Sequence, residues 1–401
     1  MTQQTSPKYV STDSPTHQGG AFDLSIMQLN AWLIPVRPNF PGCLDFQTVK
    51  RAKRMGLWLE EQAIDKRLDI AIFQEVWTPW RSFVACSIHS MFCCKLFGRN
   101  FIEDSFAKVM PYYTKVHGSR ACDCTKRFFD SGLVIASRYP IIEEMFRIYP
   151  SGSPHDALSS KGILVAAIQR PQDGGIVIVG SSHLDAGDDD SFKIRQLKIA
   201  VETMTNFSSM IRSKHPQSPI VATIFGSDMN IDGIEFWSES NSYSEAREIL
   251  EAQGFKDSWI LTARPRPIKG PNETYNPDQH PDLGITSDQH GCVKRLDYIW
   301  ACPGALLEGL KSPPVQQEMM SAPQMSKKAI KRFGVSAKTE LNDGVLWRSS
   351  KSMRQDLEKA LKEGDEVRAN KLASRIDRHD REMRLSDHAA LFAKLHFYPH
   401  K

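Results

Sequence analysis

The chain has 401 residues, of which 41% are hydrophobic and 24% charged, so it can bury a large core without disulfides or a partner. A formal net charge of +4 is small for this length and argues against binding nucleic acid over the whole surface, while a local basic face stays open. No run approaches the roughly 20 apolar residues that cross a bilayer. We therefore expect a monomer whose contact with any membrane is peripheral.

Residues 1–20 are polar and rich in Pro, Ser and Thr, and they lack the basic segment and apolar run of a secretory signal peptide. We interpret them as a disordered leader. The expected location is cytoplasmic or on a membrane surface, with export by a route that needs no signal peptide as the alternative. The eight cysteines lack the paired C-x-x-C spacing of structural zinc and are expected to be reduced thiols.

Short apolar runs, each about as long as a strand, recur along the chain and end in polar or charged residues. They are rich in β-formers and too continuous for strands with one exposed face, so we expect them to be buried between layers. The predicted strands are 24–30, 70–77, 131–141, 161–169, 176–187, 220–230, 296–301 and 388–397.

Helical patterns lie between these strands. Residues 49–64 space Met55, Leu59 and Ala63 four apart on one face, and 191–211 follows an Asp/Ser cluster typical of a helix start. The mixture predicts an α/β fold, a four-layer αββα sandwich of two packed mixed sheets flanked by helices. We expect one catalytic domain over 21–401. Two insertions interrupt it, an aromatic and cysteine-rich one at about 78–130 and a polar, basic one at about 303–384.

Polar side chains fall inside or at the edges of these strands. One such residue is usually a cap or turn residue. A whole series, in contrast, suggests strand ends that display a catalytic set at one rim of a sandwich. The series is Asn30, Glu75, His183, Asp228, Asn230, Asp297, Asp387 and His388.

The motifs around these residues resemble those of the endonuclease/exonuclease/phosphatase superfamily. This superfamily contains deoxyribonuclease I, abasic-site endonucleases, inositol-polyphosphate phosphatases and neutral sphingomyelinases. The motifs, in chain order from about residue 24 to about residue 397, are QLN, QEVW, SSHLDAG, SDMN, RLDYIW and SDH. The resemblance implies a metal-dependent phosphodiesterase.

Phosphodiester hydrolysis needs a hard cation and an activated water. Carboxylate oxygens suit Mg²⁺, so Glu75 is the first predicted metal ligand, and Mn²⁺ is the alternative ion. A histidine held by a carboxylate is the usual base, which fits His388 with Asp297 as its partner. The resemblance adds Asn30 and Asp387 as further metal ligands.

The remaining roles also follow from the resemblance. Asp228 handles the nucleophilic water or the leaving group, Asn230 and Asn30 orient oxygens and bind substrate, and His183 stabilises the charge that develops on phosphorus. Because Asp228 and Asn230 are two apart in a segment expected to be extended, they should face the same side. A buried structural histidine is the alternative for His183 and for His388.

Neutral sphingomyelinases are the branch that the sequence resembles best. SGLVIASRYPI followed by HDALSSKG is similar to their Ser-Gly-led strand and Asp-x4-Lys-Gly stretch, here Asp156 to Lys161. Lys161 would offer a cation to the substrate phosphate and Asp156 would hold or release it, with a solvated loop pair as the alternative. The implied activity is a sphingomyelin phosphodiesterase of the phospholipase C type, which hydrolyses membrane sphingomyelin to ceramide and phosphocholine.

Two features depart from that pattern or extend it. Four acidic residues follow His183 and are expected to form a solvated loop, with an added cation site as the alternative: Asp185, Asp188, Asp189 and Asp190. The first insertion combines aromatic and basic residues that suit a membrane interface or packing against the sandwich, among them Trp80, Phe83, Phe92, Lys95 and Arg99.

Other functions stay open. The first is an abasic-site or deoxyribonuclease I-like endonuclease, for which the basic helical stretch near 351–384 would contact nucleic acid. An inositol-polyphosphate phosphatase is less well supported, because Lys-Arg-Leu-Asp stands where a Trp-Cys-Asp-Arg block is expected. An inactive scaffold is the last alternative.

Overall fold

The computed structural model describes residues 21–33, 36–37, 40–44, 46–77, 106–118, 127, 129–150, 152–154, 156, 159–233, 241–262, 286–287, 294–304, 306, 333–342, 356, 359–363, 365, 368–369, 371–372, 386 and 388–399. The predicted leader at 1–20 lies outside these residues, as do Asp387 and the aromatic residues predicted for a membrane interface. The extents of both insertions therefore stay predictions.

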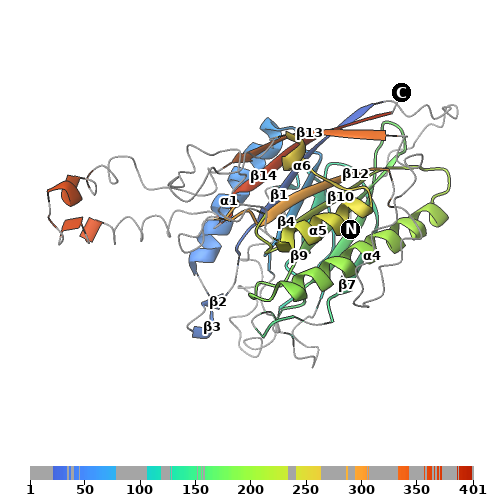
Figure 1. Cartoon of the computed structure of the whole chain (residues 1–401). Coiled ribbons are helices and arrows are strands. Elements are labelled where there is room, and N and C mark those ends of the chain that lie inside the picture. Colours follow the sequence, from blue (N-terminus) through green and yellow to red (C-terminus); the bar gives the residue numbers. More distant parts are fainter. Residues whose placement is uncertain are drawn as a thin grey trace, which may run out of the picture.

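Two six-stranded mixed sheets form the centre of the molecule (Figure 1). The first contains β1 (Phe22–Asn30), β4 (Ile70–Gln74), β5 (Tyr112–Tyr113), β6 (Val134–Ser137), β13 (Phe333–Asn342) and β14 (Ala390–Pro399). The second contains β7 (Ile141–Ile148), β8 (Gly162–Gln169), β9 (Ile176–His183), β10 (Ile220–Asp228), β11 (Lys256–Asp257) and β12 (Asp297–Pro303). Their strand orders are β13-β14-β1-β4-β6-β5 and β11-β12-β10-β9-β8-β7, and a separate pair joins β2 (Val36–Arg37) to β3 (Phe40–Leu44).

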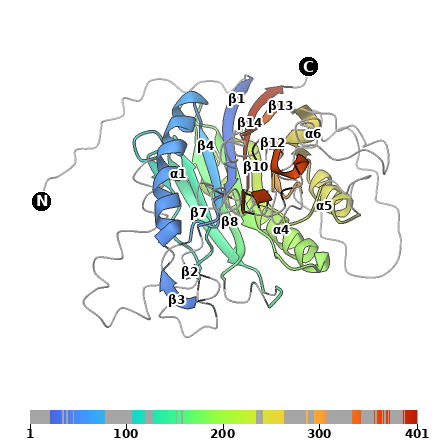
Figure 2. The ribbon, with the colours of Figure 1, turned by 90° about the vertical axis from the view of Figure 1, so that its left-hand side faces the viewer.

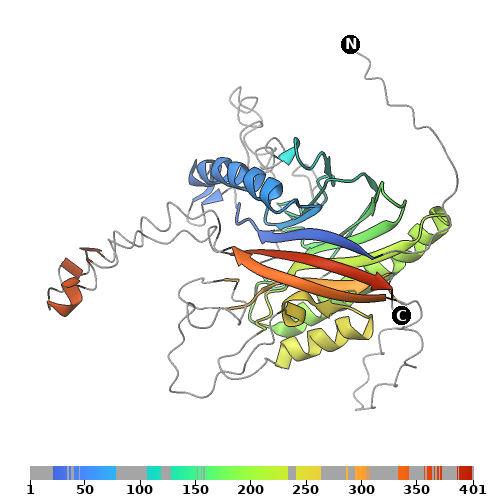
Figure 3. The same ribbon diagram turned by 90° about the horizontal axis from the view of Figure 1, so that it is seen from above.

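Helices cover the outer faces of the two sheets, with the strands between them (Figures 2 and 3). On the first sheet lies α1 (Phe46–Asp65), which buries Met55, Leu59 and Ala63 against it as their spacing predicts. The second sheet is covered by α4 (Asp190–Lys214) and α5 (Asn241–Ala252), with the short α6 (Ser258–Thr262) beside β11. The predicted four-layer αββα sandwich is confirmed.

Alternate residues of the central strands face the layer between the sheets, because side chains along a strand point to opposite faces. In most of this layer they are apolar, as at Leu24, Ile26, Ile70, Ile72, Val177, Val179, Ile224 and Ile299. Toward one end the same positions become polar, at Gln28, Asn30, Gln74, Ser181, His183, Asp228 and Asp297, and these side chains remain buried. One end of the layer between the sheets is therefore a buried polar site.

The range predicted as a polar insertion, 303–384, contributes a strand to the first sheet. Within it, β13 pairs antiparallel with β14 from Phe333 opposite Pro399 to Asn342 opposite Ala390. Elsewhere, the buried Cys302 thiol is free, as expected, and burial raises its pKa to about 12. In the part of the chain that is described, no helix has both the length and the apolar character that a membrane span requires.

Candidate active site

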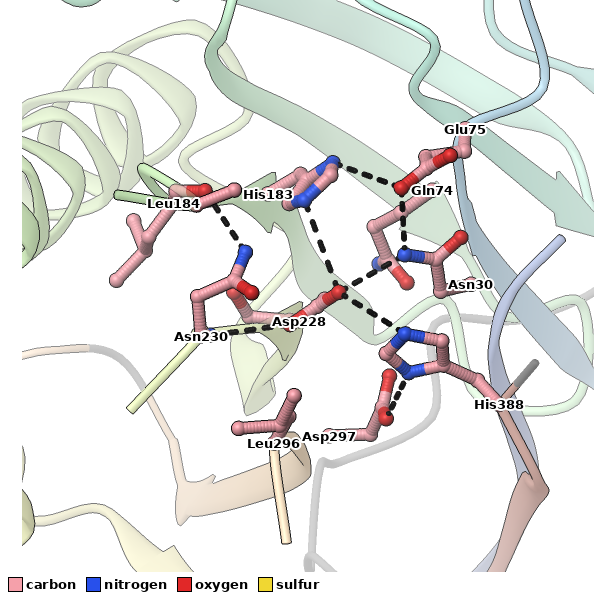
Figure 4. A network of polar contacts seen from close by, with 12 residues as sticks. Asn30, Gln74, Glu75, His183, Leu184, Asp228, Asn230, Leu296, Asp297 and His388 are labelled. Carbon is pink, nitrogen blue, oxygen red and sulfur yellow. Dashed lines mark hydrogen bonds and ion pairs between the residues drawn. The ribbon is translucent and has the colours of Figure 1, made fainter. Parts of the chain in front are cut away.

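Neighbouring strands of the second sheet place three predicted residues in one row (Figure 4). The register sets Asp228, the last residue of β10, opposite His183 on β9 and opposite Asp297 on β12. In the first sheet, Asn30 at the end of β1 pairs with Gln74 at the end of β4. The two sheets therefore bring distant parts of the chain together: Asn30 and Asp228, 198 positions apart, are hydrogen-bonded in one buried group.

His388 and Asp297 form the predicted pair. Nδ1 of His388 lies 2.6 Å from Oδ2 of Asp297, and both side chains are buried. The N–H of His388 donates to Ser386 Oγ at 3.1 Å, and the N–H of Asp297 donates to Thr286 Oγ1 at 3.0 Å, so the backbone on both sides is fixed. The imidazole thereby directs Nε2 toward Asp228 Oδ2, 3.8 Å away.

Asn30 joins two carboxylates. Its Nδ2 donates to Asp228 Oδ2 at 2.8 Å and to Glu75 Oε1 at 3.0 Å, while its Oδ1 accepts from the N–H of Trp32 at 3.0 Å. The nitrogen of the amide faces the carboxylates, and its oxygen faces the backbone. In this arrangement Asn30 orients Glu75 and Asp228, and its predicted role as a metal ligand would require the amide to turn over.

Glu75 follows β4 in a left-handed backbone conformation, with φ of 55°. This conformation costs a non-glycine residue of the order of 1–3 kcal/mol and persists where surrounding contacts enforce it. Here the N–H of Leu33 donates to the Glu75 carbonyl at 3.0 Å, and the N–H of Val76 donates to the Gly132 carbonyl at 2.9 Å. The strained turn directs the Glu75 carboxylate toward His183 and Asn30.

His183 lies between the two carboxylates. Its Nδ1 is 3.9 Å from Glu75 Oε1 and its Nε2 is 3.7 Å from Asp228 Oδ2. Burial, together with the charges of Lys161 and His388, lowers the pKa of His183 to about 3, although Asp228 opposes this shift. The imidazole is therefore neutral at neutral pH and can donate a hydrogen bond from one nitrogen.

Asn230 reaches the site by a different backbone path from the expected one. The strand ends at Asp228, and Asn230 has φ of 51°, so the expectation of an extended segment through both residues is wrong. The N–H of Asn230 instead donates to Asp228 Oδ1 at 3.0 Å, as in an Asx turn, and its Nδ2 donates to the Leu184 carbonyl at 3.1 Å. The turn places the Asn230 side chain beside the end of β9.

Asp156 and Lys161 form an ion pair in which Lys161 is buried and Asp156 is partly buried, with 2.8 Å between Lys161 Nζ and Asp156 Oδ2. The alternative of a solvated loop pair is wrong, because Lys161 is only 5% exposed. Lys161 also donates to the Leu184 carbonyl at 2.7 Å, the same carbonyl that Asn230 contacts, and Asp156 accepts from the N–H of Ala186 at 2.7 Å. Both residues are thus bound to the loop that follows His183.

Of the acidic residues after His183, Asp188 and Asp189 are exposed, as expected of a solvated loop, whereas Asp185 is not. Asp185 is fully buried and accepts the N–H groups of Ser153 at 2.6 Å and Gly187 at 2.8 Å. Asp189 caps α4 by accepting from the N–H of Ser191, and Asp190 pairs with Lys193 at 2.6 Å. These are structural contacts.

Four polar residues that support the site were not selected from the sequence: Gln28, Gln74, Thr286 and Ser386. The sequence does mark the two glutamines, because each is a polar residue in an otherwise apolar strand. Gln28 stands two residues before Asn30, and Gln74 stands one residue before Glu75. Among the described residues, a group with spacing suited to a cation consists of Asp228, Asp297 and His388, whose ligand atoms lie within 4.8 Å of one another. Two of these three already contact each other, at 2.6 Å.

Known proteins with related sequences include sphingomyelinases. A segment of 129 residues is 33% identical to sphingomyelin phosphodiesterase 3 of Rattus norvegicus and covers 30% of this chain and 20% of that protein. Sphingomyelinase C of Bacillus cereus is 31% identical over 168 residues, 40% of this chain and 49% of that protein. The matches thus span between a fifth and about half of these relatives.

No family model matches the chain. A solved structure of beta toxin from Staphylococcus aureus with bound magnesium ions aligns with a TM-score of 0.49 at 18% identity, over 93% of this chain and 99% of that one. The sequence matches confirm the predicted resemblance to sphingomyelinases.

Proposed function

We propose that the chain is a divalent-metal-dependent phosphodiesterase that hydrolyses sphingomyelin to ceramide and phosphocholine. The observation that carries the proposal is the buried His388–Asp297 pair, whose imidazole directs Nε2 toward Asp228, across from Glu75 (Figure 4). A base, its orienting carboxylate and an oxygen ligand for a cation are the parts that water attack on phosphorus requires.

The donor set around Glu75 fits Mg²⁺ or Mn²⁺. The Glu75 and Asp228 carboxylates approach one common donor, Asn30 Nδ2, and both ions prefer oxygen ligands. Glu75 would hold the ion, and Asp387, which is outside the described residues, stays a candidate ligand. A bound ion would polarise a phosphoryl oxygen and offset negative charge on the phosphate.

The positions of the side chains suggest a role for each of them in the reaction. His388 would take the proton of the attacking water at Nε2, because its Nδ1 is engaged by Asp297, whose charge favours the imidazolium that forms. Asp228 lies within 4 Å of both histidines, at 3.7 and 3.8 Å, and would orient the water or the leaving group. Neutral His183 and Asn230 would donate hydrogen bonds to the phosphoryl oxygens.

Sphingomyelin is the proposed substrate because two curated relatives carry that activity in their names. In support, Lys161 brings a buried cation to the loop that follows His183. The charge of Lys161 could pair with the substrate phosphate if Asp156 releases it. Contact with the lipid surface would be peripheral, with the chain itself cytoplasmic, exported or bound at a membrane surface.

The test offers purified chain with Mg²⁺ to several substrates in parallel: sphingomyelin liposomes, phosphatidylcholine liposomes, abasic-site DNA, plasmid DNA and an inositol polyphosphate. The expected result is release of phosphocholine from sphingomyelin that stops in EDTA and returns with added Mg²⁺ or Mn²⁺. Cleavage of DNA alone would replace the lipid function with the endonuclease alternative.

A further inference from the structure

Gln28 is a buried glutamine whose side chain reaches from the first sheet to Asp297 in the second. It is 0% exposed, and its Nε2 donates to Asp297 Oδ1 at 2.9 Å. The other carboxylate oxygen of Asp297, Oδ2, is the one that contacts His388. Each oxygen of this carboxylate thus has its own partner, on a different strand.

The orientation of the Gln28 amide follows from its neighbours. Nε2 lies 2.7 Å from Oε1 of Gln74 as well as 2.9 Å from Asp297, so both of its N–H groups have acceptors. A flipped amide would put the Gln28 oxygen against a carboxylate, which has no proton to donate. The Asp297 carboxylate therefore fixes the orientation of the Gln28 amide, with Nε2 facing the carboxylate.

Gln28 belongs to a hydrogen-bonded series of side chains that crosses between the two sheets at two places. Gln74 extends it from β4 to Ser181 on β9, with 3.3 Å between Gln74 Nε2 and Ser181 Oγ. Gln74 directly precedes Glu75, the proposed metal ligand. This series of hydrogen bonds therefore connects the backbone next to Glu75 with the Asp297 carboxylate, which contacts His388.

We propose that Gln28 is a positioning residue for the reaction and acts through Asp297. Rotation of the Asp297 carboxylate would break its bonds to Gln28 and His388 together, so Gln28 fixes the plane in which Asp297 meets His388 Nδ1. The inference rests on the proposed function, and it adds a residue that makes no contact with the substrate. Loss of an outer partner of this kind typically costs about 10-fold to 100-fold in activity.

The test is a double-mutant cycle on kinetics. Gln28→Met is close in size to the wild-type residue and removes both donated hydrogen bonds. Gln28→Asn keeps the amide but is too short to reach both Gln74 and Asp297. If one variant does not fold, the other still provides the test. The expected result is a kcat lowered about 10-fold to 100-fold with KM within about 2-fold of wild type. In an Asp297→Ala background, Gln28→Met should lower kcat by less than about 2-fold, because nothing remains to position.

Thr223→Val is the matched control, since Thr223 is also 0% exposed and the variant loses one hydrogen bond, that from Oγ1 to the Gly304 carbonyl at 2.7 Å, in the half of β10 away from Asp228. It should lower the melting temperature and leave kcat unchanged. Equal loss of kcat from Gln28→Met with and without Asp297 would overturn the proposal while the proposed function stands. A wild-type chain that hydrolyses no phosphodiester would remove both.

Discussion

Nδ2 of Asn30 lies 2.8 Å from Oδ2 of Asp228, and this bond joins the end of β1 in one sheet to the end of β10 in the other. The same nitrogen donates to Glu75 Oε1 at 3.0 Å, so one amide separates two carboxylates. Without it, two negative groups would approach each other in a buried site, where like charges are costly.

Replacing Asn30 should therefore make the folded protein dependent on a cation. Asn30→Ala is expected to lower the free energy of unfolding by about 1–3 kcal/mol, the cost of leaving buried polar groups without their donor. Because a bound cation would offset the same charges, the loss in melting temperature should be larger in EDTA than in Mg²⁺. Thermal unfolding in both buffers measures this, and an equal loss in the two would contradict a cation beside Glu75.

His388→Ala should abolish turnover while the fold remains, with kcat lowered by at least about 100-fold, the scale of lost acid–base catalysis. His396→Ala is the control, because His396 is a half-exposed histidine that pairs with an aspartate, Asp23, away from the site. Steady-state hydrolysis and circular dichroism of both variants provide the comparison. Retained activity in His388→Ala would remove this imidazole from the mechanism.

Lys161→Met should impair both stability and substrate use. Removing one partner of a buried ion pair typically costs about 3–5 kcal/mol, and here it also removes the bond to the Leu184 carbonyl. Lys193→Met is the matched control: Lys193 is similarly buried and pairs with Asp190 at 2.6 Å, but at the start of α4. We expect Lys193→Met to lower the melting temperature alone and Lys161→Met to lower kcat/KM as well. A kcat/KM equal in the two variants would assign Lys161 a structural role.

The pH dependence of stability should contain a contribution from Asp185. Burial raises the pKa of its carboxyl, but the hydrogen bonds from Ser153 and Gly187 outweigh burial and leave the pKa below its ordinary value. A carboxyl with a lowered folded-state pKa stabilises the fold above its unfolded pKa of about 3.9 and loses that contribution as pH falls through the folded value. Asp185→Asn should thus be destabilised at pH 7, and its deficit should shrink below about pH 4. Denaturant melts at both pH values measure it, and a deficit that does not change with pH would contradict this account.

Much of the fold could be predicted from the sequence because continuous apolar runs rich in β-formers have the length of buried strands. The apolar runs located β1, β8, β9, β10, β12 and β14 to within a few residues, and the four-apart apolar residues located α1. The strand β13 was missed because 303–384 is polar overall. Its pairing partner, β14, is distant in the sequence, and register between distant strands leaves no local signal.

The members of the proposed catalytic set could be selected from the sequence because they are polar residues inside or at the edges of apolar strands. Asp297 and His388 each interrupt or border an apolar strand, and their contact follows once both sheets close over one rim. The role of Gln28 was not predictable, since a lone buried glutamine looks like any other polar residue until Asp297 is seen beside it. The backbone turns at Glu75 and Asn230 were also hidden, because left-handed conformations at non-glycine residues depend on tertiary contacts.

Under the proposed function, His388 would activate the water that attacks phosphorus, and Glu75 would hold the divalent cation that the reaction needs. Hydrolysis of sphingomyelin in water enriched in ¹⁸O, with mass spectrometry of both products, tests this mechanism most directly. The account predicts that the heavy oxygen appears in phosphocholine, that ceramide carries none, and that neither product forms in EDTA. Heavy oxygen in ceramide, which would mean attack on carbon, or full turnover without a divalent cation would contradict it.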